Sequence, residues 1–369
     1  MEQTAPRSLV TGASGFLGTH LCEVLVQAGH EVVATAQPDD AGEDEPERAV
    51  FPSVVRGLGI PLAPIDLAGP GAAAALKRLL EGPEGSVAFV FHLGTLDDPG
   101  ASFEELRVAN VIGTQHLLQA ASDAEVQRVV FVSGAGVYGE PQGDEGTAVV
   151  REDAAPAPGS DLLRTLVAAE QLVLTSPGDH VVLRPGGVYG PRDPGLAAGR
   201  WELPLTRLAR WPLAAVPRNS GGHVPLVHAR DVARAALHLA VRPDAAGGIY
   251  NVGDDSQLSA REVVRLVSAL CGNAFVDLPA LPQAPVRAAL RTVGAAARHL
   301  PRLSRLLLLQ DSPAPGAFVG QTAMLGALGR DVSLDTQRLK ATGFELEYPE
   351  APRGIRETIG WYKQEGWLP

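Results

Sequence analysis

The chain has 369 residues, 20% of them charged and 45% hydrophobic, which is enough for one large domain or two ordinary ones. It carries 31 Lys and Arg against 42 Asp and Glu, and this net charge of −11 disfavours nucleic acid and anionic membrane as partners. The sequence predicts no transmembrane helix, no signal peptide, and no disulfide framework or metal site from Cys22 and Cys271. We therefore expect a cytoplasmic protein.

The first half of the chain alternates short apolar runs with segments of helical periodicity. The expected strands are residues 8–10, 31–35, 61–65, 87–92, 129–133 and 181–184. The expected helices are residues 16–28, 72–81, 103–122 and 163–175. Strands separated by helices of this length predict βαβ units and a parallel sheet, and right-handed crossovers make the sheet doubly wound. The expected fold class is α/β, a Rossmann-like doubly wound parallel sheet with a smaller, mixed C-terminal substrate lobe.

The second half is less regular. Its expected elements are a strand end and helix at residues 228–240, a strand at 250–253, and a helix at 259–271 with a Ser259–Glu262 capping box. Residues 39–47 indicate a mobile acidic loop, residues 185–219 loops with short helices, and residues 287–309 an amphipathic segment rich in Arg and Leu. We expect a dinucleotide-binding domain of residues 1–185 and 223–255, and a substrate-binding lobe of residues 186–222 and 256–369.

A glycine-rich loop follows the first expected strand and opens the first helix. Glycines at this spacing allow a tight turn, backbone approach to a pyrophosphate, and close packing of helix on sheet. The N-terminus of the helix then favours an anion. Placed between a strand and a helix, this pattern is strong evidence of a dinucleotide site. The cofactor-binding candidates in the loop are Gly12, Ser14, Gly15, Phe16, Leu17 and Gly18.

The end of the second strand leaves the choice between NAD and NADP open. NAD-binding proteins usually carry an acidic residue there for the ribose hydroxyls. This chain has Ala36 at that point, and a partner for a 2′-phosphate is not evident, although Arg56 lies within reach along the sequence. The expected cofactor is NAD or NADP, with a structural role or outright loss of the cofactor as alternatives.

Further motifs follow the glycine loop in order along the chain. They are Asp66-Leu67, His92-Leu93-Gly94-Thr95, Asn110-Val-Ile-Gly113-Thr114, Val137-Tyr138-Gly139, Arg184-Pro185, Val188-Tyr189-Gly190-Pro191, Val227-His228 and Tyr250-Asn251-Val252-Gly253. With these motifs the chain resembles the extended short-chain dehydrogenase/reductase superfamily, of the NAD-dependent epimerase/dehydratase type. The resemblance implies a Rossmann fold and adds Asp66, Leu67, Leu93, Gly94, Thr95, Asn110 and Pro185 as cofactor-binding candidates.

The three side chains that the resemblance implies for catalysis are absent. The family uses a Tyr as acid/base, a Lys four residues later, and a Ser or Thr on the substrate oxygen. The matching positions here are Leu162, Leu166 and Gly134. A shifted register does not restore the pair, because no Tyr-x-x-x-Lys occurs anywhere in the chain. The resemblance therefore predicts an atypical member whose pocket wall is apolar and whose usual proton relay is missing.

Polar groups remain on the loops that the resemblance places at the substrate. The catalytic candidates are Tyr189, His223, Arg192 and Ser133. The family's sugar-nucleotide members carry an Arg where this chain has Val224, and residues 287–309 resemble branches with apolar substrates. We therefore expect a hydrophobic small-molecule substrate.

Three functions stay open from the sequence. The favoured one is a redox-neutral cyclisation, isomerisation or elimination in small-molecule biosynthesis. The first alternative is an NAD(P)H-dependent oxidoreductase with rewired acid/base groups, and the second is a catalytically dead dinucleotide-binding partner protein. Consumption of the nicotinamide cofactor separates the first two. The resemblance also implies a possible homodimer through the helices expected at residues 103–122 and 163–175.

Overall fold

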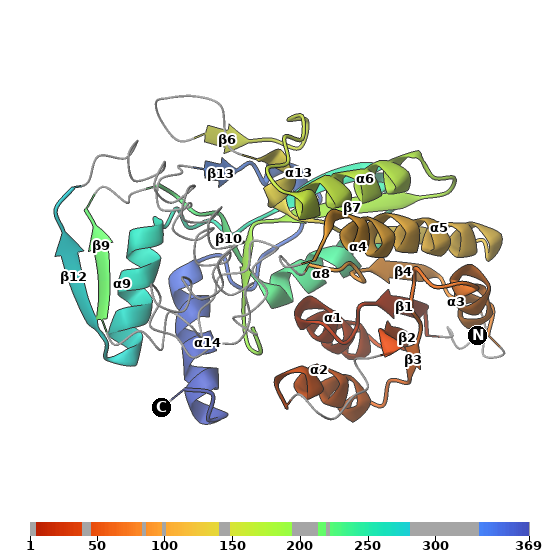
Figure 1. The fold of residues 1–369 in the computed structure, drawn as a ribbon, viewed down its shortest axis with the longest axis horizontal. Coiled ribbons are helices and arrows are strands. Elements are labelled where there is room, and N and C mark those ends of the chain that lie inside the picture. Colours follow the sequence, from red (N-terminus) through yellow and green to blue (C-terminus); the bar gives the residue numbers. More distant parts are fainter. Residues whose placement is uncertain are drawn as a thin grey trace.

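A seven-stranded parallel sheet forms the centre of the larger part of the protein (Figure 1). The computed structural model describes residues 5–38, 46–82, 86–97, 101–139, 148–193, 213–218, 222–280 and 332–368. The strands, in sheet order, are β11 Gly248–Val252, β7 His180–Pro185, β5 Arg128–Val132, β4 Phe89–His92, β1 Arg7–Thr11, β2 Glu31–Ala36 and β3 Leu62–Pro64. The order reverses between β1 and β4, which is where open α/β sheets bind ligands. The predicted doubly wound fold is confirmed.

Helices cover both faces of the sheet (Figure 1). One face carries α1 Phe16–Gln27, α2 Pro46–Gly57 and α8 Ala229–Ala240, and the other carries α3 Ala72–Leu80, α5 Gly113–Asp123 and α6 Asp161–Thr175. Successive strand residues serve opposite faces: Leu9 packs in the cluster with Leu117, and Val10 packs in the cluster with Leu21. Burial on both faces explains why these strands have continuous apolar sequences.

The helix expected at residues 103–122 is divided by a π-helical turn. It consists of α4 Phe103–Arg107, the π turn Val108–Ile112, and α5. A capping box starts α4, where the Ser102 Oγ accepts from the Glu105 backbone N at 3.3 Å. Hydrophobic periodicity does not distinguish a single widened turn from an α-helix, so the sequence missed it. Such turns are frequent at functional sites, and this one carries the buried Asn110.

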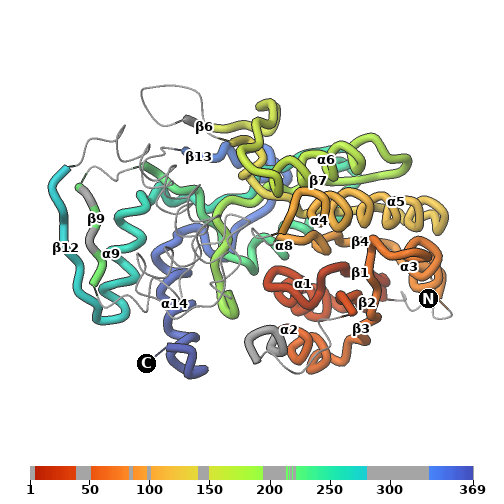
Figure 2. The backbone as a smooth tube through the Cα atoms, viewed as in Figure 1, coloured from red at the N-terminus to blue at the C-terminus, as the bar shows by residue number. Residues whose placement is uncertain are grey.

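The second lobe is built from pairs of short parallel strands and two helices. The pairs are β8 Gly187–Tyr189 with β10 Leu226–His228, β9 Leu213–Pro217 with β12 Ala274–Leu278, and β6 Ala148–Val150 with β13 Val332–Leu334. Helices α9 Ala260–Cys271 and α14 Ala351–Gln364 enclose an apolar cluster that includes Tyr189, Val264 and Ile355. The remaining short helices are η3 Ala135–Tyr138, η4 Pro243–Ala245 and α13 Gln337–Lys340. The pair β9–β12 lies at the end of the molecule remote from β2 and β3 (Figure 2).

Several expectations for the irregular segments need correction. Helix α2 begins at Pro46, inside the stretch expected to be a mobile loop, and β8 and β9 occupy a region expected to be loops and short helices. Strands of three to five residues carry little periodic signal, because their partner strands decide whether they form. The helix over residues 260–271 with its capping box is confirmed, since the Ser259 backbone N donates to Glu262 Oε2 at 2.8 Å. Residues 39–45 and 287–309 lie outside the described residues.

Within the described ranges, the helices lack the combined length and apolar character that crossing a membrane requires. The same ranges contain no group of three or more His, Cys, Asp or Glu side chains able to hold a metal ion. The division into a dinucleotide domain and a substrate lobe at the predicted boundaries stays a prediction.

Candidate functional site

The glycine loop between β1 and α1 closes tightly. Gly12 adopts a left-handed φ of +71°, and a Cβ built there lies 2.7 Å from the Gly94 backbone N. A Cβ on Gly18 lies 2.1 Å from the Gly12 carbonyl oxygen, and the Gly15 N–H donates to that oxygen at 3.1 Å. Side chains at positions 12 and 18 are therefore excluded by backbone. The glycines bring the start of α1 against the end of β1, as a dinucleotide loop requires.

The N-terminus of α1 presents backbone N–H groups rather than side chains. The N-cap residue is Gly15, and among the described residues no side chain caps this end and no acidic residue lies in the first turn. Phe16 and Leu17 are 5% and 9% exposed, so their side chains pack inward while their N–H groups stay at the helix start. Ser14 is half-buried beside them. The geometry fits a bound phosphate, which the helix dipole would stabilise.

A chain of buried hydroxyls and one imidazole holds β1, β4 and the π turn together. The Thr114 hydroxyl donates to the Asn110 carbonyl at 2.5 Å, so it accepts from His92 Nε2, 2.8 Å away. His92 Nδ1 then accepts from the Thr11 hydroxyl at 2.7 Å, and Thr11 Oγ1 accepts from the Gly94 N–H at 3.3 Å. This order assigns the proton of a neutral His92 to Nε2. His92 acts as a buried connector behind the glycine loop.

The cofactor-binding candidates that follow β3 and β4 pack against one another. Leu67 is 4% exposed, and a Cβ on Gly94 lies 2.9 Å from Leu67 Cδ1. Asp66 Oδ1 accepts from the Ala68 N–H at 3.0 Å, which fixes the turn after β3. Leu93 is also buried. The turn follows β3, whose Pro64 pairs with Ala36 at the end of β2, where the chain has no acidic residue.

Asn110 positions the loop after β4. Its Oδ1 accepts from the Leu96 N–H at 2.6 Å, and its Nδ2 donates to the Leu96 carbonyl and to Thr165 Oγ1, both at 3.0 Å. The Asn110 amide thus fixes the backbone of Leu96. Through Thr165 it also connects this loop to α6. These contacts favour an indirect role for Asn110, which holds the loop that carries Thr95.

The carboxyl ends of β4 and β5 present two buried hydroxyl groups. The Oγ1 of Thr95 and the Oγ of Ser133 are buried without a hydrogen-bond partner among the described atoms. Gly134 follows Ser133 with an extended backbone (φ −169°), and no described atom lies within 4 Å of a Cβ built on it. Pro185 ends the neighbouring β7 and is buried. A side chain at position 134 would therefore project into open space.

Helix α6 contributes buried apolar side chains to the neighbouring core. Leu162 is 5% exposed and Leu166 is fully buried, and both pack in a cluster with Phe131 and Val137. Glu170, one turn further along, forms a buried bidentate ion pair with Arg184, with distances of 2.6 and 3.1 Å. Ser160 caps α6 by accepting from the Leu163 N–H at 3.3 Å. The helix is therefore held firmly, and it presents leucines where the resemblance implied a Tyr and a Lys.

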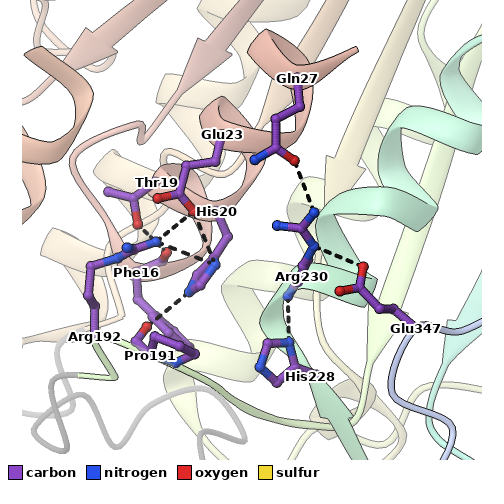
Figure 3. A network of polar contacts seen from close by, with 10 residues as sticks. All are labelled: Phe16, Thr19, His20, Glu23, Gln27, Pro191, Arg192, His228, Arg230 and Glu347. Atoms are coloured by element: carbon purple, nitrogen blue, oxygen red, sulfur yellow. Dashed lines mark hydrogen bonds and ion pairs between the residues drawn. The ribbon is translucent and has the colours of Figure 1, made fainter. Parts of the chain in front are cut away.

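Arg192 belongs to a network of polar contacts between the loop after β8 and α1 (Figure 3). Its Nη2 donates to Glu23 Oε2 at 2.8 Å, and His20 Nε2 donates to the Pro191 carbonyl at 2.9 Å. Burial, reinforced by Arg192, lowers the pKa of His20 well below its usual value. His20 is therefore neutral, and its 3.6 Å approach to Glu23 is not an ion pair. The contacts favour a structural role for Arg192, which adopts a left-handed φ of +69°.

Tyr189 lies inside the second lobe. Its side chain is fully buried between β8 and α14, and its hydroxyl has no hydrogen-bond partner among the described residues. Burial, and secondarily the Asp254 carboxylate, raises the pKa of Tyr189 above the usual value for a phenol. His223 lies elsewhere in this lobe, in an isolated antiparallel bridge with Ser259 at the start of α9. Tyr189 therefore packs with apolar side chains of α9 and α14, and His223 lies next to the start of α9.

The comparison with protein families agrees with this geometry. The model of the NAD-dependent epimerase/dehydratase family matches residues 8–253. The chain belongs to this family. That range contains the glycine loop, the hydroxyls of Thr95 and Ser133, and nearly all of the central sheet.

Individual family members that resemble the chain are enzymes. It is 30% identical over 270 residues to a 4-hydroxy-2-methyl-3-oxo-4-farnesyl-3,4-dihydroquinoline-1-oxide ketoreductase of Stigmatella aurantiaca, covering 71% of this chain and 72% of that protein. It is 30% identical over 273 residues to a 3-diazoavenalumate denitrifying reductase of a Streptomyces species, covering 69% and 78%. The UDP-glucose 4-epimerase of Thermus thermophilus, solved in complex with NAD, superposes with a TM-score of 0.65 at 24% identity, covering 97% and 99%. That last likeness shows the fold.

Sequence reasoning did not identify the residues of α1 that hold the loop after β8 in place. His20 and Glu23 lie within α1, and their partners Pro191 and Arg192 are far along the chain, since the contacts span 171 and 169 residues. A polar residue inside an amphipathic helix was the available signal, and it does not identify a partner. The local motifs, by contrast, were sufficient to predict the glycine loop and the turn after β3.

Proposed function

We propose that this protein is an enzyme that binds NAD or NADP and converts an apolar small-molecule biosynthetic intermediate by redox-neutral cyclisation, isomerisation or elimination. One observation carries the proposal: Leu162 and Leu166 of α6 are buried in an apolar cluster at the positions where the resemblance implies the proton relay. Carbonyl reduction needs a proton for the oxygen as well as a hydride, and no Tyr-x-x-x-Lys is available to supply it. A redox-neutral reaction can proceed through positioning and exclusion of water.

The residues present fit a dinucleotide. The backbone cradle of Gly12 and Gly18 leaves room for a pyrophosphate at the start of α1, and the turn at Asp66 and Leu67 borders the adenosine side. When bound, the cofactor supplies a site that accepts or donates hydride. The chain's own residues orient it: Phe16 and Leu17 through backbone N–H groups, and Asn110 by fixing the loop after β4. Ala36 at the end of β2 gives neither NAD nor NADP an evident advantage.

An apolar substrate is supported by the apolar residues that replace the polar catalytic pair on α6. Leu162 and Leu166 pack in an apolar cluster with Phe131 and Val137, in place of the Tyr and Lys that the resemblance implies. A hydroxyl from Ser133 is suited to hold one oxygen atom of the substrate. The relative from Stigmatella aurantiaca is named for a farnesylated quinoline, which is an apolar molecule.

The second candidate function is a net NAD(P)H-dependent reduction. The two relatives at 30% identity favour it, because both are named as reductases. In this case the proton would come from the substrate or from solvent, since Tyr189 is buried with a raised pKa and Arg192 is paired with Glu23. A substrate that loses a leaving group on receiving hydride would need no proton on oxygen.

The first experiment is mass spectrometry of the nucleotide released when the purified protein is denatured, with calorimetric titration of NAD, NADP and their reduced forms. Binding with micromolar affinity is expected. The second incubates the protein with a panel of apolar ketones and enones and NAD(P)H deuterated at C4. A new isomeric product with unchanged total NAD(P)H supports the redox-neutral reaction. Stoichiometric loss of NAD(P)H with deuterium in the product overturns it in favour of the reductase.

A further inference from the structure

The chain makes a tight turn where it leaves β8 and passes α1. The Asp193 N–H donates to the Gly190 carbonyl at 3.3 Å, with Pro191 and Arg192 as the two central residues. Arg192 has a φ of +69°. A turn with proline second and a positive φ third has the features of type II, in which glycine or asparagine is the usual third residue. The backbone of Arg192 is therefore in an unfavourable conformation, which its side-chain contacts must stabilise.

The Arg192 side chain is held by Glu23 of α1. Arg192 Nη2 donates to Glu23 Oε2 at 2.8 Å, and the same nitrogen lies 3.5 Å from His20 Nδ1 (Figure 3). Glu23 Oε2 is also 3.6 Å from that imidazole nitrogen. The Glu23 carboxylate thus has two basic side chains within reach, the guanidinium of Arg192 and the imidazole of His20.

Both ring nitrogens of His20 have defined roles in these contacts. The Pro191 carbonyl can only accept, so His20 Nε2 holds the ring proton and donates to it at 2.9 Å. His20 Nδ1 is then the acceptor that faces the Arg192 guanidinium. A second proton would have to occupy Nδ1, opposite a guanidinium that cannot accept a hydrogen bond. The Glu23 carboxylate is the acceptor nearest to this nitrogen.

Further titratable and charged groups face His20 from the start of α8. The ring centroids of His20 and His228 are 6.3 Å apart, and His228 Nδ1 accepts from the Arg230 N–H at 3.2 Å. The Arg230 guanidinium is paired with Glu347 at 2.9 Å. An acceptor nitrogen that is already in use and a cation give a protonated His20 no partner on this side.

Burial, reinforced by Arg192, lowers the pKa of His20 well below its usual value, so Glu23 stays with Arg192 at neutral pH. We propose that His20, on binding a proton from solvent at Nδ1 in acid, takes Glu23 from Arg192 and thereby releases Arg192 from α1. The hydrogen bond to the Pro191 carbonyl persists, because Nε2 keeps its hydrogen. The released Arg192 then leaves its left-handed conformation, and the turn at residues 190–193 opens.

The direction of this pH dependence follows from linkage. The pKa of folded His20 lies below the ordinary value of 6.5. The stability that neutral His20 contributes is therefore fully present above about pH 6.5 and is lost as pH falls through the folded pKa. The turn after β8 is thus expected to be closed at neutral pH and open in acid.

Hydrogen exchange followed by mass spectrometry tests this switch on the full-length protein, without substrate or cofactor. Protection of the peptide that contains Asp193 is measured relative to the intrinsic exchange rate at pH 8, 6, 5 and 4. In the unaltered protein we expect this protection to fall about tenfold or more in acid, through loss of a charge-assisted hydrogen bond. A peptide from β5 should keep its protection at the same pH values, because the opening is local.

Two substitutions separate the roles of the imidazole and the carboxylate. His20→Gln keeps a side-chain donor for the Pro191 carbonyl and an acceptor for Arg192 but does not titrate, so protection should stay high at every pH. Glu23→Ala removes the acceptor for which the guanidinium and the imidazolium compete. In this variant protection of the turn should already be low at pH 8 and should change little in acid.

His30→Gln is the matched control. His30 is a partly buried imidazole directly before β2, and its Nδ1 lies 2.8 Å from Ser8 Oγ. Burial lowers the pKa of His30 as well, yet this variant should keep the acid response of the unaltered protein. An identical response in His20→Gln would assign the titration to another group and overturn the proposal.

Three further outcomes would also overturn the proposed switch. The first is unchanged protection of the turn between pH 8 and pH 4 in the unaltered protein. The second is loss of protection in β5 together with the turn, which would indicate general unfolding rather than a local opening. The third is an acid response that persists in Glu23→Ala, and this result decides the matter even if His20→Gln does not fold.

Discussion

Gly354 of α14 lies so close to Tyr189 that a Cβ built on it is 2.4 Å from the Tyr189 hydroxyl oxygen and 2.9 and 3.0 Å from two ring carbons. The absence of a side chain at Gly354 therefore leaves room for the buried Tyr189 ring where β8 meets α14. Gly354→Ala should destabilise the protein by about 1–3 kcal/mol, because the ring cannot retreat within a packed cluster. Urea unfolding followed by circular dichroism measures this change.

Gly360 on the same helix provides the control. No described atom lies within 4 Å of a Cβ built there, so Gly360→Ala should be neutral or stabilising by up to about 1 kcal/mol through helix propensity. Equal effects of the two substitutions would contradict the packing argument. Combining Gly354→Ala with Tyr189→Phe should recover part of the loss, because the hydroxyl oxygen is the nearest atom.

Asp254 is expected to make stability depend on pH. Burial raises its pKa to about 7, although Ser256 hydrogen-bonds the carboxylate and lowers it, and Asp255 and Asp231 add to the rise. Because the folded pKa exceeds the unfolded value, the carboxyl contributes its stability fully below about pH 4, and this contribution is lost as pH rises to about 7. Asp254→Asn should therefore stabilise the protein at pH 8, by about 1–3 kcal/mol, and change little at pH 4.

Urea titrations of both proteins at pH 4, 6 and 8 measure this difference. The Asp254 Oδ1 that accepts from the Ser256 N–H at 3.0 Å is retained by asparagine, so the local turn should survive. An equal difference at all three pH values would contradict the assignment. Burial lowers the pKa of His228 to about 4, so His228 has the opposite effect on stability from Asp254. The stability that neutral His228 contributes is lost as pH falls from about 6.5 to 4.

Arg128 closes the C-terminal end of α8. Its Nη1 donates to the Leu239 carbonyl at 2.6 Å and the Ala240 carbonyl at 3.2 Å, and its Nη2 pairs with Asp179 at 2.5 Å. Arg128→Met should cost about 2–4 kcal/mol, because the last carbonyls of the helix lose a charged donor in a buried place. Arg107→Met, which removes an exposed ion pair with Glu104, should leave the free energy of unfolding nearly unchanged.

The contact between Arg192 and Glu23 gives a prediction about the candidate site. If this pair only fastens the loop after β8 to α1, then Arg192→Gln and Glu23→Gln should reduce stability and activity to a similar extent. The double variant should then be little worse than either one, with a coupling energy of about 1 kcal/mol. A loss of activity confined to Arg192→Gln would instead make Arg192 a substrate contact. Turnover and urea unfolding of all four proteins provide the measurements.

The sequence predicted the central sheet because each βα unit carries its own signal. The glycine loop, the strand at residues 7–11 and helix α1 are read from adjacent residues, and the family match covers nearly all of them. The surroundings of Tyr189 and Arg192 depend on partners from α14 and α1, far along the chain. Adjacent sequence cannot show that a motif tyrosine is buried against a glycine of the last helix, so both residues were candidates for catalysis on position alone.

The sealed leucine surface of α6 also limits how the enzyme can be redesigned. Leu166 is fully buried among Phe131, Val137 and Leu162, so Leu166→Lys would place an ammonium group where solvent is excluded. Installing Leu162→Tyr with Leu166→Lys is expected to cost several kcal/mol, about 3–5, before any reductase activity appears. Directed evolution toward carbonyl reduction would therefore have to loosen this hydrophobic layer first, and a selection that tolerates unstable intermediates would reach that chemistry sooner than one that demands stability at every step.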